Sequence, residues 1–176
     1  YDGSAYSNIA TVSITVNPIN DPPVANNQSV TTNEDTSIAI TLTGSDVDGT
    51  IASYDPGTPA YGTLSGTGST RIYSPNLNYN GADSFTFTVT DNQGAVSAPA
   101  LVSITINPVN DPPVFAPIGN KSVNENSLLS FTVSATDVDS TDLTYFASSL
   151  PAGASFDPVT RTFNWTPSYT QAGNYT

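Results

Sequence analysis

Asn107-Pro108-Val109-Asn110-Asp111-Pro112-Pro113 is the stretch of sequence that decides the fold, and it has a near-identical twin at Asn17-Pro18-Ile19-Asn20-Asp21-Pro22-Pro23. Each copy follows a run of alternating β-branched residues, 11–16 before the first and 102–106 before the second. Because proline fixes φ and lacks an amide donor, strand pairing cannot continue through either pair of prolines. The sequence therefore predicts that a β-strand twice enters a stiff, extended joint between modules.

The spacing of the two joints, about 90 residues, sets the domain organisation, because it is the size of one β-sandwich. No helical period persists anywhere in the chain. We therefore expect an all-β protein of tandem antiparallel β-sandwiches joined by short Pro-rich linkers. Residues 1–18 would close a truncated preceding sandwich, residues 19–108 would form a complete one, and residues 109–176 would form one that lacks its last strands.

Alternating apolar residues predict the strands of the complete sandwich. Phe85, Phe87 and Val89 form the apolar face of the most regular one, and Phe163 and Trp165 alternate in the same way in the last sandwich. Turns are expected where Gly, Asn, Asp and Pro gather, beginning with Tyr1–Ser4. The predicted strands are 10–16, 29–32, 37–43, 51–54, 61–64, 71–73, 85–89, 96–106, 129–133 and 162–166.

The composition excludes several classes of protein. The chain has no cysteine and no histidine, so it has no disulfide framework, no thiolate metal site and no histidine-based catalytic triad. A net charge of −12 with three basic residues argues against nucleic acid as a partner. No stretch is apolar enough to span a membrane. We therefore expect a protein that is not an enzyme.

The acidic residues gather in the joints and turns, with almost no base to pair with them. Glu34 precedes Asp46 by twelve residues, and Glu125 precedes Asp137 by the same distance. In a sandwich entered at one end, alternate turns return to that end. One joint would therefore collect Asn20, Asp21, Asp46, Asp48 and Asp91, and the other Glu34, Asp83, Asn110, Asp111, Asp137 and Asp139. Clustered oxygen ligands without nitrogen or sulfur favour a hard cation. Calcium is a better candidate than magnesium, which prefers fewer protein ligands in a stricter octahedron.

These motifs resemble the tandem cadherin-like repeats of large microbial surface proteins. The resemblance rests on the Asn-x-Asn-Asp-Pro-Pro joints and on the run from Tyr73 to Phe85; residues 150–156 and 163–167 resemble a related immunoglobulin-like module. It implies that the joint Asn-Asp pairs, the early Glu, the Asp-x-Asp turns and the late Asp bind calcium between domains. The chain departs from the animal cadherin pattern at Pro18 and Pro108, and Ser140 replaces the expected glycine.

We therefore expect an extracellular, calcium-stiffened stalk or filament segment, acting in cell adhesion, an extracellular matrix or a biofilm. The alternatives are a glycan- or protein-binding module displayed on such a stalk, and a spacer of a secreted enzyme. The expected partners are calcium and neighbouring copies or repeats, joined head to tail. Residues 1–16 resemble what should follow Thr176, which fits either one period of a longer array or a strand donated to a neighbouring copy.

Overall fold

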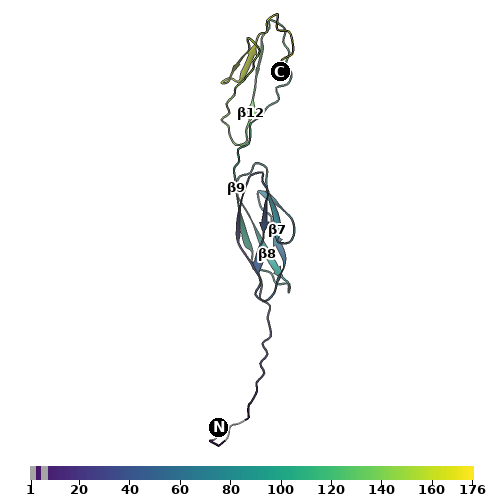
Figure 1. Ribbon diagram of the computed structural model, residues 1–176, viewed down its shortest axis with the longest axis vertical. Coiled ribbons are helices and arrows are strands. Elements are labelled where there is room, and N and C mark those ends of the chain that lie inside the picture. Colours follow the sequence, from purple (N-terminus) through teal and green to yellow (C-terminus); the bar gives the residue numbers. More distant parts are fainter. Residues whose placement is uncertain (1–2, 5–7) are drawn as a thin grey trace. The chain divides into compact units, whose positions relative to one another are not determined.

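The computed structural model describes residues 3–4 and 8–176, which form two compact units, the first ending at Pro108 and the second beginning at Val109 (Figure 1). Every regular element of the described residues is a β-strand, so the all-β expectation is confirmed. In the described part of the chain, no helix has the length and apolar character needed to cross a membrane.

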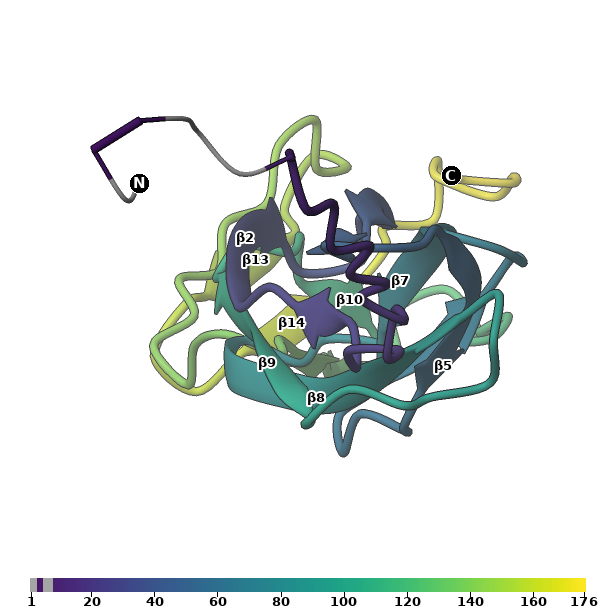
Figure 2. The ribbon, with the colours of Figure 1, turned by 90° about the horizontal axis from the view of Figure 1, so that it is seen from below.

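The first unit is a sandwich of a four-stranded and a three-stranded sheet with a small added ribbon. The four-stranded sheet has the order β2-β9-β8-β5, and the three-stranded sheet has the order β3-β7-β6. Strands β9, β8 and β5 follow one another across the view of Figure 2. The strands are β1 (Val24–Ala25), β2 (Gln28–Asn33), β3 (Ile38–Thr41), β4 (Gly44–Ser45), β5 (Ile51–Pro56), β6 (Gly62–Ser65), β7 (Thr70–Pro75), β8 (Gly81–Asp91) and β9 (Ala100–Asn107).

The core of this sandwich follows from the period-two alternation of its strands. In β8 and β9 every second side chain is buried, because successive residues of a strand point to opposite faces of the sheet. These side chains pack against Ile40, Leu42 and Tyr73 of the facing sheet. The buried apolar residues of β8 and β9 are Phe85, Phe87, Val89, Ala100, Val102, Ile104 and Ile106.

One strand pair departs from the expected antiparallel arrangement. Strand β2 runs parallel to β9, from the pair Gln28 and Val102 to the pair Asn33 and Asn107. The expectation of an antiparallel sandwich throughout is therefore wrong at this edge. The chain leaves β1, which pairs antiparallel with β4, and then enters β2, which pairs with the last strand of the unit in the same direction.

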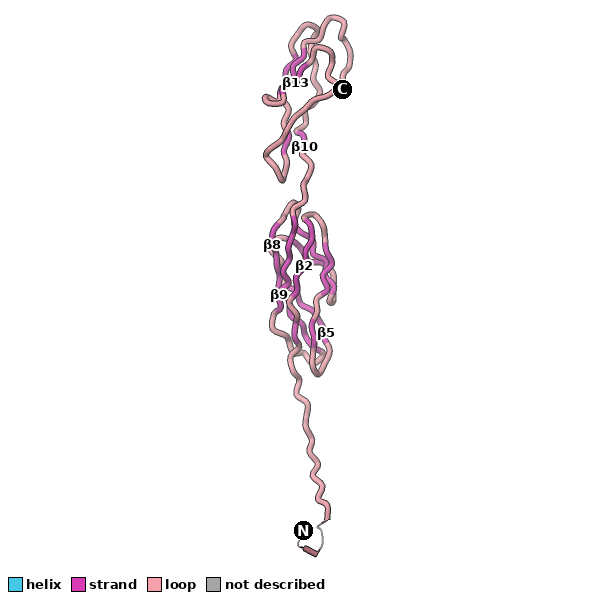
Figure 3. Tube along the Cα trace, turned by 60° about the vertical axis from the view of Figure 1, so that its left-hand side comes forward, coloured by secondary structure: helices cyan, strands magenta, loops and turns pink. Residues whose placement is uncertain are grey.

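Residues 8–23 form no strand, so the prediction of a strand over Ala10–Val16 is wrong for this structure (Figure 3). Their apolar side chains, among them Val12, Ile14 and Val16, are exposed. A strand needs partners for its backbone N–H and C=O groups, and none of the strands in the described residues pairs with this segment. The turn expected at Tyr1–Ser4 lies partly outside the described residues.

The second unit repeats part of the first. It contains β10 (Val114–Phe115), β11 (Leu129–Thr132), β12 (Ala135–Thr136), β13 (Ser155–Asp157) and β14 (Thr162–Trp165). The sheet order β11-β14-β13 reproduces β3-β7-β6, and the ribbon β10-β12 reproduces β1-β4. Trp165 is buried and faces Leu129 across β11 and β14, the position that Tyr73 holds opposite Ile38. The prediction that Trp165 belongs to the core is confirmed.

The described residues of the second unit contain no counterpart of the four-stranded sheet. Residues 119–124 and 142–147 occupy the sequence positions of β2 and β5 but form no strand. In the first unit β2 pairs only with β9, and β5 pairs only with β8. Because segments 119–124 and 142–147 have no such partner, their backbones have no sheet to join.

Candidate metal centre

One end of the first unit brings together five residues expected at the first joint. Asn20 donates from Nδ2 to Asp91 Oδ2 over 2.8 Å. The backbone N–H of Asp21 donates to the Asp48 carboxylate, at 3.3 Å from Oδ2. The Asp46 carboxylate accepts from the backbone N–H of Asp48 at 3.2 Å, as an aspartate does in a turn that it closes itself. Asn20, Asp21, Asp46, Asp48 and Asp91 therefore lie in one connected group.

Asp91 is the most strongly held carboxylate of this group. Its Oδ1 accepts from the backbone N–H groups of Gln93 and Ala95, both at 2.8 Å, so it closes the turn after β8. The hydrogen bond from Asn20 lowers the pKa of Asp91 below its ordinary value, and the backbone donors act in the same direction against the effect of burial. Asp91 is therefore an anion held in a fixed position.

Two oxygens of the group are buried and accept no hydrogen bond from the described residues. They are Oδ1 of Asn20 and Oδ2 of Asp46. Glycine at position 49 leaves room beside the second of them, because a β-carbon there would lie 2.8 Å from Asp46 Oδ2 and 2.5 Å from Asn92 Oδ1. A buried acceptor without a donor costs free energy that a bound cation would recover.

Asn92 was not among the residues predicted from the sequence. Its Oδ1 accepts from the backbone N–H of Thr50, and its own N–H donates to the Thr50 carbonyl. These bonds fix the turn after β8 to the turn that contains Asp46 and Asp48. The position of Asn92 directly after Asp91 was the only available signal.

The donor set fits a hard cation in kind, since every candidate ligand is an oxygen. It is not a concentrated carboxylate site, because no group of three or more His, Cys, Asp or Glu side chains in residues 3–4 and 8–176 is arranged to hold a metal ion. A cation at this end would be held by carboxylate and amide oxygens together, completed by water.

Two residues expected at the second joint belong to the first unit and lie in different surroundings. Glu34 is buried, and its Oε2 accepts from Asn80 Nδ2 at 3.3 Å. Its backbone N–H donates to the carbonyl of Asn107, which fixes the end of β2 to the end of β9. Asn80 was not predicted; it lies in the expected turn before β8.

Asp83 is buried, and its carboxylate accepts hydrogen bonds from other residues of the sandwich. Its carboxylate accepts from the backbone N–H groups of Ala60, Tyr61 and Ser84 and from the Tyr73 hydroxyl at 2.7 Å. Burial raises its pKa, but these four donors outweigh burial, so the pKa lies below the ordinary value. For Tyr73, burial and the hydrogen bond to Asp83 both raise the pKa. The geometry gives Asp83 the role of fixing β8 to the 59–61 turn.

In the second unit, Asp111, Asp137 and Asp139 repeat the arrangement of Asp21, Asp46 and Asp48, whereas Asn110 makes a different contact from Asn20. The backbone N–H of Asp111 donates to Asp139 Oδ2, as that of Asp21 does to Asp48. Asp137 Oδ1 accepts from the backbone N–H groups of Asp139 and Ser140 at 2.8 and 3.0 Å. Asn110 donates from Nδ2 to the carbonyl of Asp111. An ion shared by these residues with Glu34 and Asp83 stays a prediction.

The three basic residues do not balance the acidic groups. Arg71 donates to the carbonyls of Gly68, Thr70 and Tyr54. Lys121 donates to the Ile118 carbonyl and lies over the ring of Phe131, and Arg161 lies over the ring of Tyr145. None of these contacts is with a carboxylate, so the acidic turns depend on solvent or on bound cations for neutralisation.

Comparison with known families agrees with the division of the chain into two modules. Residues 20–105 match the family described as bacterial Ig domain, and residues 112–176 match the family described as putative Ig domain. Both modules are immunoglobulin-like. This supports the Ig-like part of the sequence expectation, and the cadherin-like part stays a prediction.

A relative of the Ig-like modules is integrin beta-like protein A of Dictyostelium discoideum, 31% identical over 160 residues. The match covers 76% of this chain and only 8% of that protein. Among solved structures, the fibronectin(III)-like modules of Clostridium thermocellum CbhA are 21% identical, with 49% of this chain and 47% of that chain covered and a TM-score of 0.37.

A second structural neighbour is the endo-fucoidan hydrolase MfFcnA4 of glycoside hydrolase family 107, 18% identical, with a TM-score of 0.43. The match covers 94% of this chain and 27% of that chain. At these TM-scores the structural likenesses carry no argument, and the Ig-like assignment rests on the two family matches. Ig-like modules are typically non-catalytic units of larger proteins.

Proposed function

We propose that these Ig-like modules are a non-catalytic structural segment of an extracellular or cell-surface adhesion protein, and that calcium stiffens it at the ends of its modules. The similarity to an integrin beta-like protein supports the adhesion class. The match to a bacterial Ig family supports the surface location. The proposal extends the roles expected from the joint motifs.

The observation that carries the proposal is the pair of buried acceptors at one end of the first unit. Asn20 Oδ1 and Asp46 Oδ2 lie in a group that also contains the backbone N–H of Asp21 and the carboxylates of Asp48 and Asp91. Calcium binds six to eight oxygens at about 2.3–2.6 Å in flexible geometry, and it accepts amide, backbone and water oxygens as well as carboxylates. Magnesium demands a stricter octahedron, which this mixed set fits less well.

Binding would act on the segment that enters the unit. Asn20 and Asp21 lie on that segment, whereas Asp46 and Asp48 lie on a turn of the sandwich and Asp91 ends β8. A cation held by both groups would remove the repulsion between Asp21 and the turn carboxylates and would fix residues 20–21 against the sandwich. Because proline fixes φ, the Pro22-Pro23 pair would then limit the directions in which the preceding chain can leave the sandwich.

A calcium titration with a matched variant tests the proposal. We expect calcium to raise the melting temperature of the first unit, because it binds the folded state. At a calcium concentration of about 100 times Kd, this binding would increase the free energy of unfolding by about 2.7 kcal/mol. Asp46→Asn should weaken calcium binding measured by calorimetry. Asp55→Asn is the control, because Asp55 is an exposed residue of β5 outside the group and should leave binding unchanged.

Two results would contradict the calcium role. One is a melting temperature that is the same in millimolar calcium and in a chelator. The other is equal calcium affinity in Asp46→Asn and the original chain. Small-angle scattering with and without a chelator separates stiffening from binding alone, because stiffening requires a calcium-dependent change in the scattering profile.

The alternative of a glycan-binding module has one observation in its favour. Tyr61 and Tyr79 stack with ring centroids 4.2 Å apart and planes 6° apart, and Tyr61 is exposed. Two cavities of the second unit, of about 420 and 400 Å³, contain only Phe131 and Tyr145 respectively as aromatic lining residues. A glycan array in which Tyr61→Ala abolishes binding would favour this function over the structural one.

A further inference from the structure

The two sheets of the first unit have four edge strands, which are β2 and β5 in one sheet and β3 and β6 in the other. An edge strand presents backbone N–H and C=O groups without a neighbour. Proteins usually protect such edges with charges, prolines, bulges or a covering segment. Among the described strands of the first unit, β6 is the edge that carries none of these protections.

The other three edges are protected in recognisable ways. Strand β5 ends in Asp55 and Pro56, and a bulge interrupts its register with β8. The edges of β2 and β3 are bridged by a side chain, because Nε2 of Gln28 donates to the Thr41 carbonyl over 2.7 Å. A charge, a proline, a bulge and a covering side chain therefore account for these three edges.

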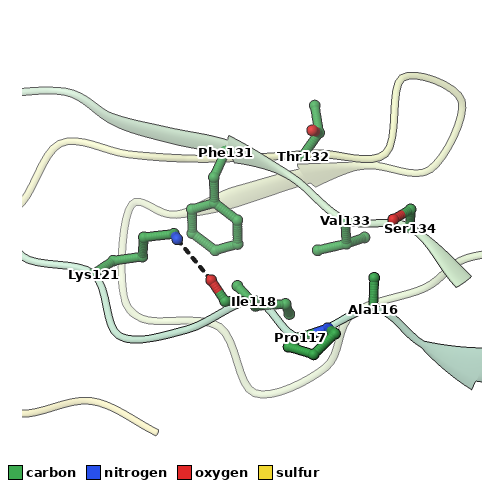
Figure 4. A pocket seen from close by; sticks show the side chains of 8 residues that line it. All are labelled: Ala116, Pro117, Ile118, Lys121, Phe131, Thr132, Val133 and Ser134. Atoms are coloured by element: carbon green, nitrogen blue, oxygen red, sulfur yellow. Dashed lines mark hydrogen bonds between the residues drawn. The ribbon is translucent and has the colours of Figure 1, made fainter.

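The corresponding sheet of the second unit, β11-β14-β13, has a charge beside both of its edges. Lys121 lies over the Phe131 ring of β11 and donates to the Ile118 carbonyl (Figure 4). Strand β13 ends in Asp157, which Pro158 follows. Strand β6 contains no charged residue and no proline, and its register with β7 has no shift. It is therefore open to a further strand, whereas its counterpart β13 is protected.

The pairing of β6 with β7 shows which backbone groups point outward. The Tyr61 carbonyl accepts from the N–H of Asn76, and hydrogen-bonded and non-hydrogen-bonded pairs alternate along an antiparallel ladder. Gly62 and Leu64 therefore hold non-hydrogen-bonded positions. Pro75, which faces Gly62, has no N–H and fits this alternation. The N–H and C=O groups of Gly62 and Leu64 point away from β7, where no described strand pairs with them.

We propose that β6 pairs antiparallel with β6 of a second copy of the chain, so that two three-stranded sheets join into one sheet of six strands. A two-fold axis beside Thr63 places Gly62 opposite Leu64 of the second copy, and Leu64 opposite its Gly62. These two pairs use every outward N–H and C=O group of both strands. An axis beside Gly62 or Leu64 would pair only that residue with itself within β6. Thr63 then faces Thr63 of the second copy, which is a favourable cross-strand pair.

The charge distribution favours a second copy as the occupant of this edge. The chain has a net charge of −12, but no acidic residue lies between Asp55 and Asp83. The one charged residue of that stretch is Arg71, which donates to backbone carbonyls. Neither β6 nor its neighbour β7 carries a carboxylate. Two copies therefore meet at β6 without placing acidic side chains against each other, although both are strongly acidic.

Exposed side chains beside the edge enlarge the contact. Tyr61 and Ile72 are 47 and 45% exposed. In the proposed register Tyr61 faces Ser65 of the second copy, next to the pair of Thr63 side chains. Because β6 is only four residues long, the buried area is small, and we expect a weak and reversible dimer.

The proposed contact is isologous, since both copies use the same surface, and it therefore closes at a dimer. Because the two strands are antiparallel, the two first units run in opposite directions. Modules presented from two facing surfaces can adopt this arrangement. The inference does not depend on calcium, so it stands or falls separately from the proposed function.

Cysteine cross-linking of the full chain tests the register, because the chain contains no cysteine of its own. Opposed residues of a non-hydrogen-bonded pair have Cα atoms about 4.5 Å apart, which lies within the disulfide range of about 4.4–6.8 Å. We expect Thr63→Cys to form a disulfide-linked dimer under mild oxidation. Thr41→Cys is the matched control, since Thr41 is an exposed threonine on the other edge strand of the same sheet.

Two cross-linking results would contradict the proposal. Equal rates of dimer formation for Thr63→Cys and Thr41→Cys would overturn the assignment of β6 as the contact. Ser65→Cys should form a dimer more slowly than Thr63→Cys, because Ser65 faces Tyr61 of the second copy. A faster reaction through Ser65→Cys would overturn the register.

Sedimentation analysis tests the association itself. We expect the mass of the original chain to rise with concentration in chelator as well as in calcium. Thr63→Asp should abolish the rise, because it places two like charges directly opposite each other. Thr41→Asp adds the same charge at the other edge of the sheet and should retain the rise. Equal effects of the two variants would place the contact elsewhere and overturn the proposal, as would a chain that stays monomeric at several hundred micromolar.

Discussion

Asn20 Nδ2 donates a 2.8 Å hydrogen bond to Asp91 Oδ2, across 71 positions of sequence. This bond links the segment that enters the first unit to the turn that follows its longest strand. This contact therefore holds the joint motif against the sandwich.

Replacing the donor tests that link. Asn20→Ala removes the largest cause of the lowered Asp91 pKa, while the backbone donors of Gln93 and Ala95 remain. We expect the Asp91 pKa to rise toward its ordinary value of 3.8 in a carboxyl NMR titration. Asn26→Ala is the control, since Asn26 donates only to the exposed Thr43 hydroxyl in a side-chain contact. An unchanged Asp91 titration would contradict the assignment.

Acid should destabilise the first unit through Asp83 and Asp91. Both have folded-state pKa values below 3.8, so the unfolded chain binds protons first as pH falls. Their stabilisation is fully present above the unfolded pKa and is lost as pH falls through the lower folded values. We therefore expect the melting temperature to drop most steeply below about pH 4, where the unfolded carboxylates titrate. A melting temperature constant from pH 5 to pH 2 would contradict this.

The hydroxyl of Tyr73 supports Asp83 from inside the core. Tyr73→Phe leaves the ring in place but removes one of the four donors to a buried carboxylate. We expect a loss of about 1–3 kcal/mol in the free energy of unfolding, measured in urea at neutral pH. Tyr79→Phe removes a hydroxyl bonded to an exposed carbonyl and should cost much less. Equal losses in the two variants would show that Asp83 does not depend on Tyr73.

The two copies of the strand motif should respond differently to truncation. Ile104→Ala opens a cavity in the core of the first unit and should lower its stability by about 2–5 kcal/mol. Ile14→Ala alters an exposed side chain and should leave the unfolding of dilute chain unchanged. Denaturant unfolding at low protein concentration makes the comparison. A similar loss in both variants would mean that residue 14 is buried in the folded chain.

Gly62 is required by the ring of Tyr73. A β-carbon at position 62 would lie 2.5 Å from Tyr73 Cε2 and 2.7 Å from the Ser74 carbonyl oxygen. Gly62→Ala should therefore separate β6 from β7 and lower the melting temperature of the first unit. Gly57→Ala is the matched control, because its nearest neighbour would lie at 3.3 Å. Equal melting temperatures for the two variants would contradict the steric argument.

The sequence predicted those strands in which the alternation of apolar and polar residues itself shows which side chains are buried. The alternation of Phe85, Phe87 and Val89 is a local signal, and β8 contains all three residues on its buried face. The same reasoning failed at Ala10–Val16, because alternation states which face a strand would bury but does not supply a partner. The parallel pairing of β2 with β9 was missed for a related reason, since it depends on how the chain crosses between sheets.

The candidate site was predictable to the extent that turns return to the same end of a sandwich. That argument brought Asn20, Asp48 and Asp91 together correctly. It gave no information on which oxygens already have donors. Three of the four donors to Asp83, from Tyr73, Tyr61 and Ala60, lie 10, 22 and 23 positions earlier in the sequence, and only the folded sandwich brings them near.

The parallel alignment of β2 and β9 decides how the first unit resists tension. Chain entering before β2 and chain leaving after β9 pull these two neighbours in opposite directions along their common axis. All backbone hydrogen bonds from Gln28–Val102 to Asn33–Asn107 are then sheared together, whereas a hairpin pulled at its open end releases its bonds one after another. Force applied along the chain therefore meets its greatest opposition at this one edge, and a proline placed in β2 would weaken the module under tension more than at rest.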